Sequence, residues 1–196
     1  MQHREHVQEG GPLVAAVLLT SACSSLNPFA SSAAKPAALV DFTPSAELAS
    51  TWSANIGDAG PYRFQPAVWS DAVYAAGHDG EVARFEGGRP VWRTDTDTDL
   101  SAGVGTDGRL AVVAATDGAV IALDAATGSE RWRAEVGAEV LAPPAVSLEF
   151  VIVRASDNRL IALDARDGSR RWVYQRNNPP LALRSFASVI IEGPVV

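Results

Sequence analysis

Four tryptophans recur at a fixed interval of 40 residues, at Trp52, Trp92, Trp132 and Trp172. A fixed period of this size is the signature of a repeat architecture, in which each repeat is one supersecondary unit that packs on its neighbours. Residues 122–132 (ALDAATGSERW) and 162–172 (ALDARDGSRRW) match almost position for position, and residues 83–92 are a shorter, degenerate copy. Any fold for this chain therefore places similar units of about 40 residues side by side.

Each repeat contains short apolar runs rich in β-branched residues, which predict strands. The runs that follow one another in a repeat are separated by residues that tolerate positive φ and close tight turns, at 78–80, 116–118 and 156–158. A further turn, at 87–88, 127–128 and 167–168, leads into the strand that holds the tryptophan. With an earlier strand at 66–68, 102–104 and 144–146, each unit is a four-stranded antiparallel meander. This is the size and content of a β-propeller blade, so we predict an all-β propeller fold.

We expect the propeller to occupy residues 49–196. Its predicted parts are a closing strand at 49–57, blades at about 62–98, 99–138 and 139–178, and an incomplete blade at 179–196. Burying one tryptophan ring removes ~200 Å² from water, worth up to about 5 kcal/mol at ~25 cal/mol per Å². We therefore expect the four tryptophans to dock blades on one another, with ligand contact as the alternative.

The sequence of the N-terminal region predicts a targeting signal followed by a flexible tether. Residues 13–19 are an apolar run too short for a membrane span of about 20 residues, but typical of a secretory signal peptide. The segment LLTSAC that ends at Cys23 resembles the bacterial lipobox, in which the cysteine is lipidated and becomes the mature N-terminus. We expect a signal peptide at 1–22, lipidation of Cys23 and a flexible tether at 23–48, with an incidental thiol as the alternative. Ser24 at the next position implies, by the same resemblance, sorting to the outer membrane.

Composition and motifs argue against several kinds of chemistry. A net charge of −7 disfavours nucleic-acid binding, and a single cysteine excludes an internal disulfide. The acidic run 95–99 imitates the start of a calcium loop, but Leu100 stands where the turn glycine belongs and Thr106 where the closing glutamate belongs. His78 has no serine or cysteine partner in a catalytic motif and is expected to be a turn residue. We predict no catalytic residue, no metal site and no cofactor.

The pattern Ala-Leu-Asp-Ala-x-x-Gly-x-x-x-Trp resembles the tryptophan-docking repeat of pyrroloquinoline-quinone (PQQ) type propellers. Together with the lipobox, the spacer and the segment around Trp52, it resembles the BamB family of lipoproteins. This resemblance implies a non-enzymatic scaffold of the β-barrel assembly machinery, lipid-anchored at the periplasmic face of the outer membrane. It also implies a ring of eight blades, for which roughly 320 residues are needed. We therefore expect about three complete blades and the start of another, in an apparently truncated chain.

The connection after Trp172 contains the residues that the resemblance assigns to a partner. BamB proteins carry a Leu-x-Leu-Arg element there, so Leu181, Leu183 and Arg184 are expected to contact the periplasmic POTRA region of BamA. Alternate leucines of an extended segment point the same way, and an apolar pair beside an arginine suits an interface hot spot. The alternative is that both leucines pack into the propeller. Unfolded outer-membrane proteins are a second hypothetical partner, to which no residue is assigned.

A rival function uses the same blade repeat. The chain would then be a fragment of a PQQ-dependent quinoprotein dehydrogenase or of a PQQ-like sensor domain. Such dehydrogenases require a cofactor pocket with a calcium-ligating acidic cluster and commonly a vicinal disulfide, which one cysteine cannot form.

Overall fold

The structure is a computed structural model that describes residue 46 and residues 49–175 and 185–192. The chain divides into two compact units, residues 1–48 and 49–196, and every element below belongs to the second. The expected signal peptide and nearly all of the tether lie outside the described residues. Within the described part, all regular structure is β-strand, and no helix there is long and apolar enough to cross a membrane. The predicted all-β class is confirmed.

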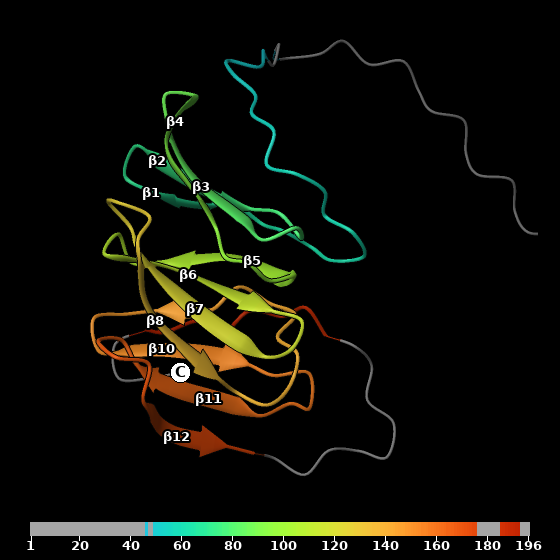
Figure 1. The fold of residues 1–196 in the computed structure, drawn as a ribbon, viewed down its shortest axis with the longest axis vertical. Coiled ribbons are helices and arrows are strands. Elements are labelled where there is room, and N and C mark those ends of the chain that lie inside the picture. Colours follow the sequence, from blue (N-terminus) through green and yellow to red (C-terminus); the bar gives the residue numbers. More distant parts are fainter. Residues whose placement is uncertain (1–45, 47–48, 176–184, 193–196) are drawn as a thin grey trace, which may run out of the picture. The chain divides into compact units, whose positions relative to one another are not determined.

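Twelve strands form three four-stranded sheets (Figure 1). In each sheet the strands pair antiparallel in chain order, which is the meander of a propeller blade. Blade one contains β1 (Ala67–Trp69), β2 (Ala72–Ala76), β3 (Glu81–Glu86) and β4 (Arg89–Asp95). Blade two contains β5 (Leu100–Thr106), β6 (Leu110–Ala115), β7 (Ala119–Asp124) and β8 (Glu130–Glu135). Blade three contains β9 (Ala145–Val146), β10 (Phe150–Arg154), β11 (Leu160–Asp164) and β12 (Arg170–Tyr174).

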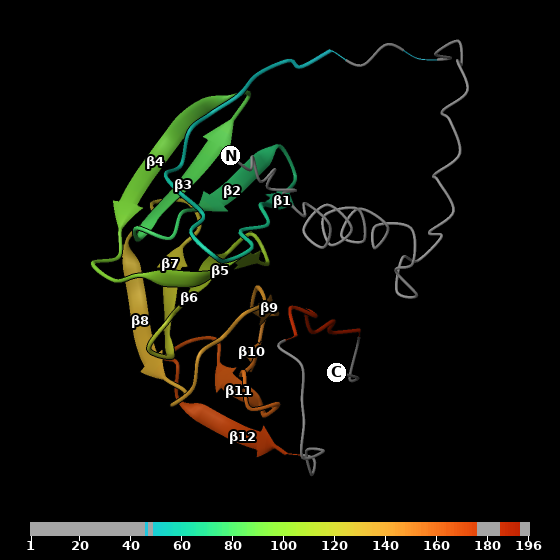
Figure 2. The same ribbon diagram turned by 90° about the vertical axis from the view of Figure 1, so that its right-hand side faces the viewer.

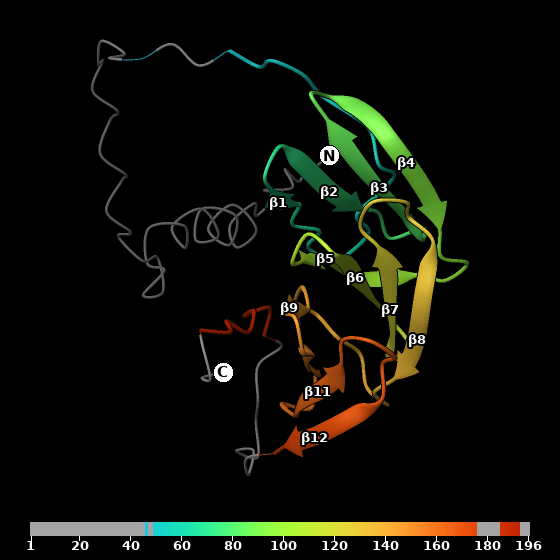
Figure 3. The same ribbon diagram turned by 90° about the vertical axis from the view of Figure 1, so that its left-hand side faces the viewer.

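The first strand of each blade is the innermost and the fourth the outermost. Strand β5 contacts both β1 and β9, whereas β4, β8 and β12 lie on the outer side (Figures 2 and 3). Because consecutive strands are antiparallel, the first and third turns of every blade lie at one face of the propeller, which we call face A. The second turns and the connections between blades lie at the opposite face, face B. The chain therefore leaves β12 at face B.

Blade two is buried on both sides, which explains the composition of its strands. In β6 the side chains of Leu110 and Val112 pack toward blade three, in a cluster with Val151. Their neighbours Ala111 and Val113 pack toward blade one, in a second cluster. A strand with both pleat faces buried reads as a continuous apolar run rather than an alternating one. This accounts for the runs at 110–115 and 119–123.

The predicted second turns are confirmed. Gly80, Gly118 and Asn158 occupy the same place in the three blades, and all have positive φ, of 96°, 94° and 66°. The second turn of blade one is also tied to the connection that leads to blade two, because the Thr96 hydroxyl donates to the carbonyl of Gly80 at 3.0 Å. Thr96 is only 2% exposed. The acidic run 95–99 is thus a connection with exposed carboxylates, as expected, but one buried threonine fastens it to the preceding turn.

The expected closing strand at 49–57 differs from the structure, in which these residues form no strand. A strand needs a neighbour that exchanges backbone hydrogen bonds with it, and among the described residues none is aligned with this segment. Instead the segment is attached at single points. Arg93 Nη2 donates to the carbonyl of Asn55 at 3.0 Å, and just after the segment the carbonyl of Asp58 accepts a hydrogen bond from the N–H of His78 at 2.8 Å. Of the expected incomplete blade at 179–196, residues 185–192 are described, and they contain no strand.

Candidate functional site

Two of the repeated tryptophans make the same pair of contacts with the next blade. Trp92 Nε1 donates to the carbonyl of Ala125 at 3.1 Å, and Trp132 Nε1 donates to the carbonyl of Ala165 at 3.0 Å. Each ring also lies flat against a glycine of that blade. A Cβ built on Gly128 would come within 2.6 Å of Trp92 Cδ2, and one on Gly168 within 2.6 Å of Trp132 Cε3. The ring and the third turn of the following blade therefore fit together without room for a methyl group.

The first and last tryptophans of the series are less enclosed. Trp52 lies on Gly88, where a Cβ would come within 2.7 Å of its Cγ, and its ring centroid is 6.1 Å from that of Phe85. Trp52 is nevertheless 41% exposed and Trp172 37%, against 8% for Trp132. The difference in exposure depends on how many described blades surround each ring, because Trp132 belongs to the blade that has a complete blade on each side.

The aspartate of the repeat closes the third turn from within. Asp164 is only 3% exposed, and its carboxylate accepts hydrogen bonds from the backbone and side chain of Arg166 and from Arg171. These bonds, first those from the Arg166 side chain, hold the pKa of Asp164 well below its usual range. At the equivalent Asp124, burial raises the pKa, but bonds from Thr127 outweigh it, so the pKa is lowered. Both aspartates are thus ionised parts of the turn at neutral pH.

The residues assigned to the partner and to the lipid lie outside the described part of the chain. These are Cys23, Leu181, Leu183 and Arg184. The structure does describe the two residues that directly follow Arg184. Arg154 Nη1 donates to Ser185 Oγ at 2.9 Å, and the guanidinium carbon of Arg63 lies 5.1 Å from the ring centroid of Phe186. Ser185 and Phe186 are therefore held against the propeller by these two arginines.

The two arginines that hold Ser185 and Phe186 come from distant parts of the chain. Arg154 ends β10 at face B and also donates to Asn158 Oδ1 at 2.8 Å, which fixes the second turn of blade three. Arg63 precedes blade one and pairs in parallel with Ala102 of β5. Sequence patterns did not point to either arginine, because both contacts depend on a fold that brings residues 63, 154 and 186 together.

His78 lies in a turn, where it links two blades. Its Nδ1 lies 2.7 Å from the carbonyl of Leu100, which requires a proton on that nitrogen, and its ring lies 5.1 Å from that of Tyr62. Leu100 begins β5, so the histidine connects the second turn of blade one to blade two. Among the described residues, no group of three or more histidine, cysteine, aspartate or glutamate side chains is placed to hold a metal ion.

Comparisons with known proteins point to one family. A family model described as outer membrane protein assembly factor BamB matches residues 78–196. The outer membrane protein assembly factor BamB of Burkholderia pseudomallei (strain K96243) is 42% identical over 111 residues, which cover 56% of this chain and 28% of that protein. The BamB of Bordetella pertussis (strain Tohama I) is 40% identical over 92 residues, covering 46% and 24%. The matched part of the chain thus spans about a quarter of the length of these relatives.

Solved structures agree on the architecture. BamB from Moraxella catarrhalis matches with a TM-score of 0.59 at 33% identity, covering 62% of this chain and 37% of that one. The quinohemoprotein alcohol dehydrogenase from Comamonas testosteroni matches with a TM-score of 0.50 at 24% identity, covering 60% and 21%, and this likeness extends to the fold alone. The family model covers more than half of the chain and the relatives share its name. The chain belongs to the BamB family, described as outer membrane protein assembly factors.

Proposed function

We propose that the chain is a non-enzymatic assembly factor for outer-membrane proteins, which binds the periplasmic POTRA region of BamA through Leu181, Leu183 and Arg184. The observation that supports this most directly is the family match, because residues 78–196 include the whole proposed contact segment. The matching relatives are named outer membrane protein assembly factors, whereas the similarity to the alcohol dehydrogenase concerns the fold alone.

The packing of Ser185 and Phe186, which follow the proposed contact residues, supports a role of that segment in binding a partner. Ser185 and Phe186 are half-buried and held by Arg154 and Arg63, so the end of the segment is fixed to the propeller. A partner that binds a segment with a fixed end faces a smaller entropic cost of ordering it. Two leucines and an arginine next to this fixed end are suited to form a small hot spot.

Binding to the purified POTRA region of BamA tests the proposal. Leu183→Ala or Arg184→Ala should weaken binding by at least about tenfold, equal to about 1.4 kcal/mol. Arg170→Ala is the matched control, because it removes the same charge from an exposed position on β12. Retained affinity in folded Leu183→Ala and Arg184→Ala proteins would contradict the assigned contact. Tight uptake of PQQ with calcium, measured by calorimetry, would instead favour the dehydrogenase or sensor alternative.

We also propose that a lipid on Cys23 holds the protein at the periplasmic face of the outer membrane. Several acyl chains on one N-terminus bury enough methylene groups, at ~0.8 kcal/mol each, for stable attachment. The intact mass of the mature protein should show an acylated Cys23 as the first residue, and Cys23→Ala should release the protein from membranes. A mature chain with an unmodified N-terminus would refute the anchor.

A further inference from the structure

Blade one departs from the other blades at one position of the repeat. In blades two and three the residue opposite the docking tryptophan is a small alanine, Ala122 or Ala162, which pairs in turn with Val112 or Ile152. In blade one the residue opposite Trp92 is Arg84, and it pairs with Tyr74. Two buried apolar side chains are thus replaced by an arginine and a tyrosine, on the side of blade one that faces blade two.

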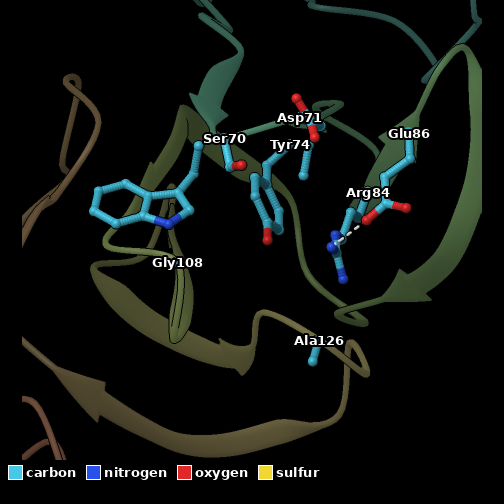
Figure 4. Close-up of a pocket in the computed structure, with 9 residues that line it drawn as sticks. Ser70, Asp71, Tyr74, Arg84, Glu86, Gly108 and Ala126 are labelled. Atoms are coloured by element: carbon cyan, nitrogen blue, oxygen red, sulfur yellow. Dashed lines mark hydrogen bonds and ion pairs between the residues drawn. The ribbon is translucent and has the colours of Figure 1, made fainter.

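These two side chains form part of a hollow of about 250 Å³ at face A, between blades one and two (Figure 4). The residues that line it are Trp69, Ser70, Asp71, Ala72, Tyr74, Arg84, Glu86, Gly108 and Ala126. Trp69 is the one tryptophan outside the 40-residue series, and it is 51% exposed. Its ring is nonetheless fixed against blade two, because a Cβ on Gly108 would come within 2.1 Å of its Nε1. The Trp69 ring therefore forms one wall of the hollow, half exposed to solvent and held in a fixed position.

The charge of the lining is negative. Arg84 is ion-paired with Glu86, and its guanidinium carbon lies 5.8 Å from the ring centroid of Tyr74. The arginine is thus paired with the carboxylate and lies against the ring, while its Nε is buried without a hydrogen-bond partner among the described residues. Asp71 is exposed and makes no hydrogen bond or ion pair with the described residues, and the Glu86 side chain is 49% exposed. Two carboxylates against one guanidinium leave the hollow suited to a positively charged group.

We propose that this hollow binds a basic side chain, an arginine or a lysine, carried by an extended segment of a partner protein. The cation would lie on the Trp69 ring and pair with the carboxylate of Asp71, which combines a cation–π contact with charge pairing. A volume of about 250 Å³ is below the ~300–1,000 Å³ typical of small-molecule sites, and it suits a single side chain.

The surroundings favour a polypeptide as the carrier of that charge. Arg109, next to Gly108 in the lining, donates through Nη2 to the carbonyl of Leu148 at 3.2 Å. Leu148, which is 73% exposed, is thus held beside Arg109 on the first turn of blade three, at the same face A. A neighbouring apolar residue of the bound segment therefore has a side chain to pack on. Because the hollow lies at face A and the chain leaves β12 at face B, the inference does not rest on the proposed POTRA contact.

Paired peptides test the inference with the full 196-residue chain. The probe is an acetylated, amidated and fluorescently labelled pentapeptide with a central arginine, and its twin carries citrulline, which has nearly the same shape without the charge. Fluorescence anisotropy should show at least about tenfold weaker binding of the citrulline twin. The arginine peptide should also shift the NMR signal of the Trp69 indole N–H, which is identified by its loss in Trp69→Phe.

Variants of the lining separate binding from folding. Trp69→Ala and Asp71→Asn should each weaken binding of the arginine peptide about 3- to 10-fold, while Trp69→Phe, which keeps an aromatic face, should retain most of it. Val91→Ala is the control, because Val91 is 47% exposed on β4 and lies outside the hollow. If Trp69→Ala does not fold, Asp71→Asn decides, since Asp71 is exposed. Equal binding of both peptides, or unchanged affinity in Asp71→Asn, would overturn the inference.

Discussion

The contact between a glycine and a tryptophan at each blade interface can be tested with a matched pair of substitutions. In Gly168→Ala the new Cβ would lie 2.6 Å from Trp132 Cε3, in a residue whose φ is +73°. Gly137 has a φ of +72°, but nothing lies within 4 Å of the place its Cβ would take. The two substitutions therefore carry the same backbone cost, and only one of them disturbs the docked ring.

The expected magnitudes follow from these two terms. A side chain in the left-handed region costs roughly 1–2 kcal/mol, offset by the ~0.4–1 kcal/mol that replacing glycine removes from the entropy of the unfolded chain. Gly137→Ala should therefore lower the free energy of unfolding by about 1 kcal/mol. Gly168→Ala adds overpacking of about 1–3 kcal/mol. The Trp132 ring, 8% exposed and bonded through Nε1 to Ala165, cannot move aside without losing these interactions.

Urea unfolding followed by far-UV circular dichroism measures both variants under one set of conditions. We expect Gly168→Ala to lose about 2–4 kcal/mol and Gly137→Ala about 1 kcal/mol. The near-UV signal should change in Gly168→Ala alone, because only that variant displaces a tryptophan. Equal losses in the two variants would mean that the flat contact contributes nothing beyond backbone conformation and that it does not dock one blade on the next.

Three further outcomes follow from the geometry. Trp132→Ala should cost about 3–5 kcal/mol of unfolding free energy, and Trp172→Ala clearly less, because its ring is 37% exposed; equal costs in urea unfolding would contradict this. Thr96→Val should cost about 1 kcal/mol for the lost hydrogen bond, which thermal unfolding can detect, and no loss would show that this bond does not stabilise the fold. The lowered pKa of Asp164 means that the folded state holds fewer protons there than the unfolded state, so its stabilisation is present above about pH 4 and is lost as the pH falls. Asp164→Asn should therefore flatten the fall of the urea midpoint between about pH 5 and pH 3, and an unchanged slope would contradict the shift.

The period of the tryptophans predicted the fold because it fixes which residues meet between blades. Trp52, Trp92 and Trp132 each dock on the third turn of the blade that follows them, so the spacing of the tryptophans equals the length of a blade, and a single sequence displays that length directly. The turn positions followed from the same period, since Gly80, Gly118 and Asn158 all take the positive φ that their residue types allow. Contacts that recur with the 40-residue period could thus be predicted from the sequence.

The strand register of blade one could not be predicted from the 40-residue period. By the 40-residue period, Arg84 matches Asp124, the aspartate that closes the third turn of blade two. In the structure Arg84 instead takes the place of Ala122, opposite the docking tryptophan. The reason is the third turn of blade one, which is a tight hairpin closed by the pair Glu86 and Arg89. The shorter turn moves the strand by two residues, and neither the hydrophobic pattern nor the tryptophan spacing records that shift.

The separation of the two cores explains how blade one can differ without disturbing the rest. Side chains on one face of β6 pack toward blade three, and those on the other face pack toward blade one. A repeat protein of this kind is stabilised by nearest-neighbour interfaces, so a change at one interface has little effect on the next. Arg84 and Tyr74 alter only the interface between blades one and two. That interface keeps its docking contacts, because Trp92 Nε1 and the Tyr74 hydroxyl both donate to the carbonyl of Ala125, at 3.1 and 3.3 Å. Blade one can therefore form a charged, aromatic hollow at face A while the docking of its tryptophan is preserved.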